Sequence, residues 1–227
     1  MREETASNGL TLRGRPVPTY IAVEGPIGVG KTTLARRIAE TFAHELLLEE
    51  AELNPFLERF YQNRQQTALA TQLFFLFQRV QKITELKQRD MFDQNRVADF
   101  VLEKDPLFAR VNLDADEYAL YQKVFEKMRV DAPVPDLVIY LQANPDRLLE
   151  RIEKRGIDAE RLIERTYLEQ LNEVYSEFFL YYDDAPLLIV NANDIDLTRG
   201  DRDYEQLINY MLDIKKGRHY FNPTFFS

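Results

Sequence analysis

The sequence predicts an α/β protein in which helices cover both faces of a five-stranded parallel sheet, giving a three-layer sandwich. Two observations predict this fold. Short runs rich in apolar and β-branched residues alternate with longer segments of helical periodicity. The short runs are apolar almost throughout, which is typical of strands buried on both faces. The five predicted strands are residues 19–24, 46–50, 96–102, 136–142 and 186–193.

Helical segments separate these strands. In the first of them, Leu34, Ile38 and Phe42 recur at four-residue spacing and share one face. An Asn-Pro pair at residue 54 favours a helix start, and Gly156 favours a helix end. The predicted helices are residues 31–45, 54–63, 65–92, 114–130, 144–156, 160–182 and 202–216.

One domain accounts for this succession of elements. It is expected to span residues 19–216, between a polar N-terminal tail of residues 1–18 and a C-terminal tail of residues 217–227. With 227 residues, of which 45% are hydrophobic, the chain is large enough to bury a proper core.

The composition disfavours several classes of function. A formal net charge of −9 argues against broad binding to nucleic acid or anionic membranes, because both need concentrated positive charge. Without cysteine, the chain has no disulfide, thiolate nucleophile or cysteine-bound metal. No run approaches the roughly 18 apolar residues of a membrane span, and the polar N-terminus lacks a signal core. We therefore expect a cytoplasmic protein.

Residues 25–32 match the pattern G-x-x-x-x-G-K-[ST] directly after a predicted strand and at the start of a helix. Glycines let backbone N–H groups turn toward bound phosphates, and the helix N-terminus adds the positive end of its dipole. Lys31 is expected to bridge the outer phosphates and to act in catalysis. The fold is therefore of the P-loop kind, and the residues predicted to bind ATP are Gly25, Pro26, Ile27, Gly28, Val29, Gly30, Lys31, Thr32 and Thr33.

A magnesium site is predicted beside this loop. The Thr32 hydroxyl is one expected ligand of Mg²⁺. Asp99 lies near the end of the third predicted strand, where a carboxylate would complete the metal's coordination. A phosphate loop with a magnesium site serves hydrolysis as well as transfer to an acceptor, so these residues leave the reaction open.

The chain resembles the deoxynucleoside kinase family from Tyr20 to the last helix. The resemblance is carried by "EGPIGVGKTTLA" and by "EEAELNPFLERFY", in which Asn-Pro and Phe-Tyr resemble the bacterial members. It implies Mg²⁺-dependent transfer of the γ-phosphate of ATP to the 5′-hydroxyl of a small-molecule deoxynucleoside, with a purine favoured. It also implies that a glutamate after the second strand takes the hydroxyl proton. Spacing assigns this role to Glu49, with Glu50 as the alternative.

The resemblance extends to the residues that would hold the acceptor. Gln72 and Arg79 match the family's glutamine and arginine that face the base, and seven residues are two helical turns, so both project from one face. The predicted substrate-binding residues are Tyr61, Gln72, Arg79, Asp105, Phe108 and Glu160. The tyrosine and the glutamate would bind the sugar 3′-hydroxyl, and the aspartate would pair with the arginine. The phenylalanine would either stack on the base or belong to the core.

The segment "ERIEKRGIDAE" resembles the family's arginine-rich helical lid over the transferring phosphate. Arg151 and Arg155 match two lid arginines and are predicted to be catalytic, whereas Ile157 replaces a third. A pattern of ion pairs on a helix surface would also explain the charges in this segment.

One motif departs from the family. Its members carry an acid-Arg-Ser triplet after the third strand, and here the triplet reads Asp99-Phe100-Val101. The missing arginine removes a cation from a site where electrostatic stabilisation is a large part of catalysis. Three explanations are open: Arg96 or Lys104 supplies that charge instead, the acceptor differs from that of the family, or catalysis has declined.

Two other functions are compatible with the donor loop. A nucleoside monophosphate kinase of the thymidylate kinase type would need a basic clamp for the acceptor's phosphate and usually an arginine after Asp99, where Phe100 stands. A weakly active regulatory subunit that binds nucleotide would fit the altered triplet. It would not explain the retained Lys31, Thr32 and Glu49.

A homodimer is expected through the helix at residues 65–92. Its central run "LFFLF" is apolar all round, which indicates burial within the molecule or between two copies. Helix-mediated pairing is also what the family resemblance implies.

Overall fold

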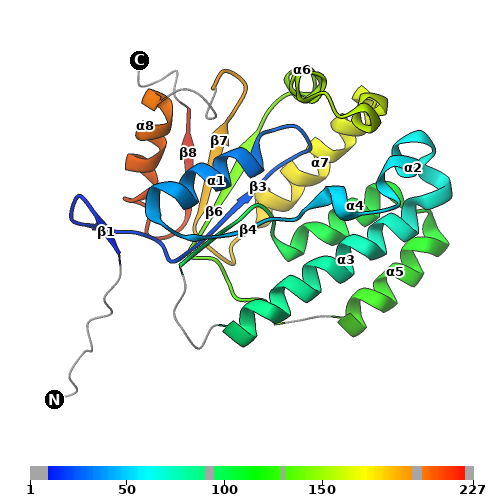
Figure 1. The fold of residues 1–227 in the computed structure, drawn as a ribbon, viewed down its shortest axis with the longest axis horizontal. Helices are drawn as coiled ribbons and strands as arrows, with labels where there is room; N and C mark the ends of the chain where they lie inside the picture. Colours follow the sequence, from blue (N-terminus) through cyan, green and yellow to red (C-terminus); the bar gives the residue numbers. More distant parts are fainter. Residues whose placement is uncertain (1–9, 90–94, 129–130, 196–200, 223–227) are drawn as a thin grey trace.

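The computed structural model describes residues 10–89, 95–128, 131–195 and 201–222. In this part of the chain, six parallel strands form the main sheet in the order β4-β5-β3-β6-β7-β8 (Figure 1). Along the chain they are β3 (Tyr20–Glu24), β4 (Glu45–Leu47), β5 (Arg96–Ala98), β6 (Leu137–Gln142), β7 (Leu187–Asn191) and β8 (Arg218–Phe221). The predicted α/β class with a parallel sheet is thus confirmed.

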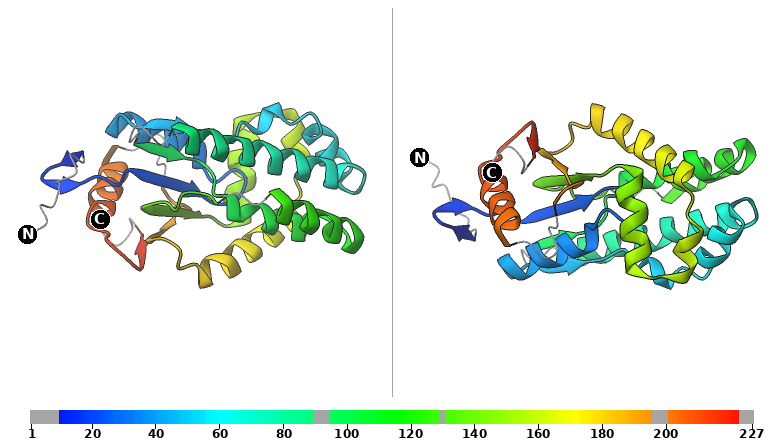
Figure 2. Two further views of the ribbon diagram at one scale, coloured as in Figure 1. Left: turned by 90° about the horizontal axis from the view of Figure 1, so that it is seen from below. Right: turned by 90° about the horizontal axis from the view of Figure 1, so that it is seen from above.

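Helices flank the sheet, and Figure 2 shows α1 and α7 on opposite faces of it. Figure 1 shows α3 and α5 side by side, extending beyond the sheet. None of the described helices combines the length and apolar character needed to cross a membrane. Their bounds are α1 (Lys31–Phe42), α2 (Leu57–Gln62), α3 (Arg64–Arg89), α4 (Asp105–Asn112), α5 (Ala115–Met128), α6 (Pro145–Arg155), α7 (Arg165–Tyr181) and α8 (Asp201–Met211).

The core lies between these helices and the sheet. The predicted apolar face of α1 is buried, with Leu34, Ile38 and Phe42 all less than 5% exposed. On β6, the Tyr140 ring stacks against Phe179 of α7 at a centroid distance of 4.1 Å. Apolar residues in β6 are buried from end to end, as expected of a strand covered on both sides.

The sheet has a sixth strand that the sequence prediction missed. Strand β8, "RHYF", pairs with β7 at one edge of the sheet and lies within the segment predicted as a C-terminal tail. Its polar residues do not resemble a strand buried on both faces. For that reason the apolar runs of the sequence did not predict it. The predicted N-terminal tail likewise contains a two-stranded hairpin, β1 (Thr11–Leu12) with β2 (Arg15–Pro16).

Several predicted helices have different ends or are divided. The predicted helix 160–182 is a 3₁₀ turn, η4 (Asp158–Leu162), followed by α7, because Ile163 and Glu164 adopt extended backbone angles. Asn54 does not cap α2; its side chain accepts a hydrogen bond from Phe56 N, and the helix begins later. Helix α4 was not predicted at all. The predicted ends at residues 90–92 and 129–130 lie outside the described residues.

The topology brings three loops together at the carboxyl ends of the strands. Strand β3 is central, β5 and β4 lie on one side of it, and β6 lies on the other. Because all these strands are parallel, the segments that follow β3, β4 and β5 leave the sheet at the same edge. In open α/β sheets, ligands bind at the carboxyl ends of the strands, where the strand order changes direction.

The sixth strand should matter for stability. Phe221 is 2% exposed and Tyr220 is 65% exposed, although the two are neighbours on β8. We expect Phe221→Ala to lower the free energy of unfolding by about 3 kcal/mol or more, because it leaves a cavity in the core. Tyr220→Ala should change it by less than about 0.5 kcal/mol. Urea unfolding followed by circular dichroism would measure both free energies. A loss for Phe221→Ala as small as that expected for Tyr220→Ala would show that β8 does not pack on the core.

Candidate active site

The phosphate loop joins β3 to α1 and packs closely on α6. Gly30 caps α1 with a φ of 106°, and Gly28 has a φ of 82°, both in the region that favours glycine. A Cβ atom on Gly28 would lie 2.7 Å from Ile152 Cγ1 and 3.0 Å from Leu148 O. Glycine at position 28 therefore permits the close approach of the loop to α6, the helix whose sequence resembles the family's lid.

A cavity of about 450 Å³ lies between this loop and α6. Glu150 supplies acidic lining, but most charged residues around the cavity are basic. They are Lys31, Arg147, Arg151, Lys154 and Arg155. A chain with a net charge of −9 thus concentrates positive charge at the N-terminus of α1, as binding of a triphosphate requires.

The Lys31 ammonium lies inside the loop. Its Nζ donates hydrogen bonds to Gly25 O at 2.7 Å and to Pro26 O at 3.1 Å. Burial lowers the pKa of Lys31 to about 8, and the nearby Lys104 ammonium lowers it further, against the opposing effect of surrounding carboxylates. A bound phosphate would stabilise this ammonium, so the site is suited to an anion.

Asp99 connects the phosphate loop to the segment after β4. The Thr32 hydroxyl donates to Asp99 Oδ2 at 2.5 Å, and Glu49 N donates to Asp99 Oδ1 at 2.8 Å. A hydroxyl and a carboxylate are hard oxygen ligands of the kind Mg²⁺ prefers. The described residues contain no cluster of three or more histidines and acidic residues that could hold a metal. The pair therefore fits a Mg²⁺ ion that is bound mostly by phosphates and water.

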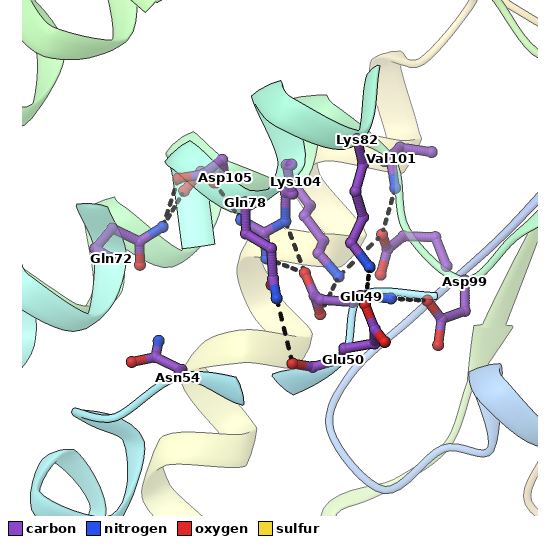
Figure 3. A network of polar contacts seen from close by, with 12 residues as sticks. Glu49, Glu50, Asn54, Gln72, Gln78, Lys82, Asp99, Val101, Lys104 and Asp105 are labelled. Carbon is purple, nitrogen blue, oxygen red and sulfur yellow. Dashed lines mark hydrogen bonds and ion pairs between the residues drawn. The ribbon is translucent and has the colours of Figure 1, made fainter. Parts of the chain in front are cut away.

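Glu49 is held by a cation at each of its two carboxylate oxygens, and Figure 3 shows one of these cations, Lys104. Arg79 Nε donates to Oε1 at 2.7 Å, and its Nη2 also contacts that oxygen. Lys104 Nζ lies 3.0 Å from Oε2. Burial by itself would raise the pKa of Glu49, but Arg79 and Lys104 together lower it to about 2. The carboxylate is therefore ionised and oriented.

Glu50 points elsewhere. Its backbone has a φ of 53°, a left-handed conformation unusual for a residue with a side chain. The carboxylate pairs with Lys82, and Gln78 donates to the backbone oxygen of Glu50 at 3.4 Å. Of the two glutamates considered from the sequence, Glu49 is the one whose carboxylate lies among the other predicted site residues.

A second polar cluster surrounds Asp105, which is completely buried. Gln72 Nε2 donates to Asp105 Oδ1 at 2.6 Å, and the Arg79 guanidinium pairs with Oδ2. Gln72 and Arg79 are each 3% exposed, so they are not surface residues. The Tyr121 hydroxyl, on α5, donates to Asp105 Oδ1 at 2.8 Å. Sequence reasoning missed Tyr121, because a tyrosine among apolar residues of a helix gives no sign of a polar contact.

The two residues predicted to bind the sugar, Tyr61 and Glu160, lie near Arg155. Arg155 forms an ion pair with Glu160, and both charges influence the partly buried Tyr61 hydroxyl, whose pKa is raised chiefly by burial. Phe108 packs edge-to-face against Tyr175 of α7, with ring centroids 6.0 Å apart. This contact joins Phe108 to the core, the second of the two roles considered for it.

Arg151 links the phosphate loop to the end of β7. Its guanidinium donates to Val29 O at 3.1 Å and to Ala192 O at 2.6 Å. It thus holds the backbone around the donor cavity. Its contact with a transferring phosphate stays a prediction.

The position after Asp99 is apolar in surroundings as well as in sequence. Phe100 is 1% exposed and packs with Ile83 and Leu102. Arg96 begins β5, at the opposite end of that strand from Asp99, with its guanidinium 5.7 Å from the centre of the Tyr20 ring. Of the two cations considered as replacements, Lys104 is therefore the one that lies in the site.

Glu24, at the end of β3, is a buried carboxylate that accepts several hydrogen bonds, and the sequence prediction did not include it. Its Oε1 accepts hydrogen bonds from Gly25 N at 2.8 Å and from the Tyr175 hydroxyl at 2.9 Å. Its Oε2 accepts from Val101 N at 3.0 Å and lies 3.6 Å from Lys104 Nζ. A glutamate that ends an apolar strand and directly precedes a phosphate loop is a sequence signal that could have identified it.

Comparisons with known proteins agree with one another. A family model described as "Deoxynucleoside kinase" matches residues 21–214. The chain is 32% identical to a deoxyguanosine kinase of Bacillus subtilis (strain 168), over 86% of this chain and 97% of that protein. It is 29% identical to a deoxyadenosine/deoxycytidine kinase of the same strain, over 88% and 94%. A solved structure of deoxyadenosine kinase from M. mycoides with bound dATP is similar, with a TM-score of 0.72 and 30% identity over 85% and 98%. The resemblance stated from the sequence is confirmed.

The contact between the phosphate loop and α6 can be tested at Gly28. We expect Gly28→Ala to weaken ATP binding more than tenfold, because the added Cβ would push the loop and α6 apart. Gly14→Ala is the matched control, since Gly14 also has a positive φ but has no atom within 4 Å of the added Cβ. Isothermal titration calorimetry with ATP would decide. A Gly28 variant that binds ATP like wild type would contradict the proposed packing constraint.

Proposed function

The chain belongs to the deoxynucleoside kinase family and is a phosphotransferase, and we propose that it transfers the γ-phosphate of ATP to the 5′-hydroxyl of a purine deoxynucleoside, with Mg²⁺. One observation carries the proposal. A continuous polar network runs from Thr32 through Asp99, Glu49 and Arg79 to Asp105. It joins the donor loop to the buried cluster that faces the acceptor.

The donor half of the site binds the triphosphate. The backbone N–H groups of the loop and the Lys31 ammonium hold the phosphates, and the basic residues of α6 add positive charge. A Mg²⁺ ion held by Thr32 and Asp99 would neutralise charge on the β- and γ-phosphates. The hydrogen bond from the Thr32 hydroxyl to Asp99 supports this assignment, because it brings the two oxygens close together.

The acceptor half of the site supplies the general base that takes the proton of the hydroxyl. As the 5′-oxygen attacks, the O–H bond breaks and the proton passes to Glu49, while the bond from the γ-phosphorus to the leaving oxygen of ADP breaks. The products are ADP and a deoxynucleoside 5′-monophosphate. A partly buried, ionised carboxylate beside the donor loop is the group this step needs. Its low pKa keeps it ionised until the hydroxyl arrives.

The Gln72 side chain supports a base with an N–H group on its edge. Its amide nitrogen donates to Asp105, so its carbonyl oxygen is the atom left to accept from a ligand. The amino group of adenine and the N1–H of guanine are such donors, and so are the amino group of cytosine and the N3–H of thymine. The choice of a purine therefore rests on the relatives named for deoxyguanosine and deoxyadenosine.

The cations of the acceptor half argue against a nucleoside monophosphate as acceptor. Arg79 is shared between Glu49 and Asp105, and Lys104 lies against Glu49 and Glu24. An acceptor phosphate would need a cation that is not already neutralised by carboxylates.

The test is a transfer assay with [γ-³²P]ATP. Deoxyguanosine, deoxyadenosine, deoxycytidine and thymidine, the four corresponding monophosphates, and buffer alone would be compared. We expect label on the purine deoxynucleosides before the others and slow release of phosphate in buffer. Faster labelling of a monophosphate, or release of phosphate without any acceptor product, would overturn the proposal.

Tyr121 should affect the choice of base. Tyr121→Phe removes one donor from the buried Asp105 carboxylate, and hydrogen bonds to charged groups contribute about 1.5–3 kcal/mol. We expect a loss in kcat/KM of roughly 10- to 150-fold, at 1.36 kcal/mol per factor of ten, that differs between deoxyguanosine and deoxyadenosine. Tyr118→Phe is the control, because that ring stacks on Tyr121 at 6.2 Å. Equal losses for every nucleoside would mean that the hydroxyl stabilises the fold and does not influence base choice.

The pairing of two chains through α3 stays part of the proposal. Leu76 of the "LFFLF" run is buried, but Phe77 is 49% exposed. We expect a mass of two chains by sedimentation equilibrium at micromolar concentration, and dissociation in Phe77→Glu. Leu180→Glu is the control on α7, at a site 59% exposed. A wild-type monomer would refute the pairing without affecting the catalytic proposal.

A further inference from the structure

Lys104 is a buried cation with two carboxylate neighbours. It ends the short 3₁₀ turn η3 (Leu102–Lys104) that follows β5, and it is 2% exposed. Its Nζ lies 3.0 Å from Glu49 Oε2 and 3.6 Å from Glu24 Oε2. An ammonium buried to this degree is stable only when it is paired, so its position is set by these two acids.

The two oxygens of Glu49 are not equivalent. Oε1 is engaged by both Nε and Nη2 of Arg79, which is itself fixed on its other side by Asp105. Oε2 takes one N–H from Lys104. A carboxylate oxygen has two lone pairs, so Oε2 retains the capacity to accept a proton from a ligand. Lys104 thus contacts the oxygen that is suited to act as the base.

Glu24 fixes the ammonium from the side of the phosphate loop. It accepts hydrogen bonds from Gly25 N, Val101 N and the Tyr175 hydroxyl, which come from three separate segments. A carboxylate held by this many donors gives Lys104 a rigid support. Figure 3 shows the Lys104 nitrogen beside the carboxylate of Glu49, with the Lys82 nitrogen near Glu50.

We infer that Lys104 is a positioning residue, supported by Glu24, that directs Oε2 of Glu49 toward the 5′-hydroxyl of the acceptor. The inference rests on the proposed function, in which Glu49 takes the hydroxyl proton. Lys104 itself gives and takes no proton. It holds one oxygen of the base while Arg79 holds the other, so that the carboxylate keeps a single orientation when the hydroxyl arrives.

The experiment is a double-mutant cycle of wild type, Lys104→Met, Glu49→Gln and the double variant. The single-turnover transfer rate is measured at saturating ATP and deoxyguanosine, together with the Kd for ATP. We expect Lys104→Met alone to slow transfer more than thirtyfold, with the Kd for ATP changed less than threefold. In the Glu49→Gln background the same change should slow transfer less than threefold further, because residues that act through one another are not additive.

Two further variants separate positioning from general stability. Lys104→Gln keeps an N–H donor without the charge, and we expect it to transfer phosphate at least threefold faster than Lys104→Met. Lys82→Met removes an ammonium that pairs with Glu50 beside the same segment, and it should stay within threefold of wild type. Thermal unfolding of every variant gives its folded fraction, by which each rate is corrected.

Four outcomes would overturn the inference. Lys104→Met could transfer phosphate within threefold of wild type, or it could slow transfer by the same factor in both backgrounds. In either case a slow Glu49→Gln variant would leave the proposed function standing. A Glu49→Gln variant as fast as wild type would overturn both, and a wild-type protein without transfer to any deoxynucleoside would overturn the proposed function first.

Discussion

The site depends on the carboxylate of Asp99, which holds two loops of the sheet edge at a fixed separation. One oxygen accepts from the Thr32 hydroxyl at the start of α1, and the other accepts from Glu49 N after β4. These contacts are possible because β5 lies between β3 and β4, so that the residue after β5 reaches the loops on both sides. The distance between the phosphate loop and Glu49 is therefore set by the order of strands in the sheet.

The charges around Asp99 are mutually dependent. Arg79 and Lys104 neutralise Glu49, while Glu24 and Asp105 neutralise those cations in turn. Burying such ions is costly, and removal of one partner leaves another uncompensated. Single substitutions here would consequently affect stability as well as chemistry. A network that orients the Glu49 carboxylate, the proposed general base, can be retained for that reason even where an apolar core would fold more stably.

Much of this arrangement could be predicted from the sequence, and the failures have identifiable causes. The phosphate loop, the strands β3 and β6 and the helix face containing Gln72 and Arg79 follow from local patterns, because spacing alone decides which side chains share a face. The contact of Tyr121 with Asp105 joins residues that are distant in sequence, and no local pattern records it. Strand β8 was missed since an edge strand with polar residues lacks the apolar run that identifies buried strands.

The choice between Arg96 and Lys104 shows how backbone geometry decides where a charge can act. Arg96 lies three residues before Asp99 along an extended strand, which at about 3.3 Å per residue places it roughly 10 Å away along β5. Lys104 is farther from Asp99 in sequence, but the chain turns after β5 and the 3₁₀ turn η3 returns it to the site. Phe100, between them, packs into the core with Ile83. A cation beside Glu49 can come from any segment that reaches the site, so Lys104 on a neighbouring turn occupies that place while the position after Asp99 serves the core.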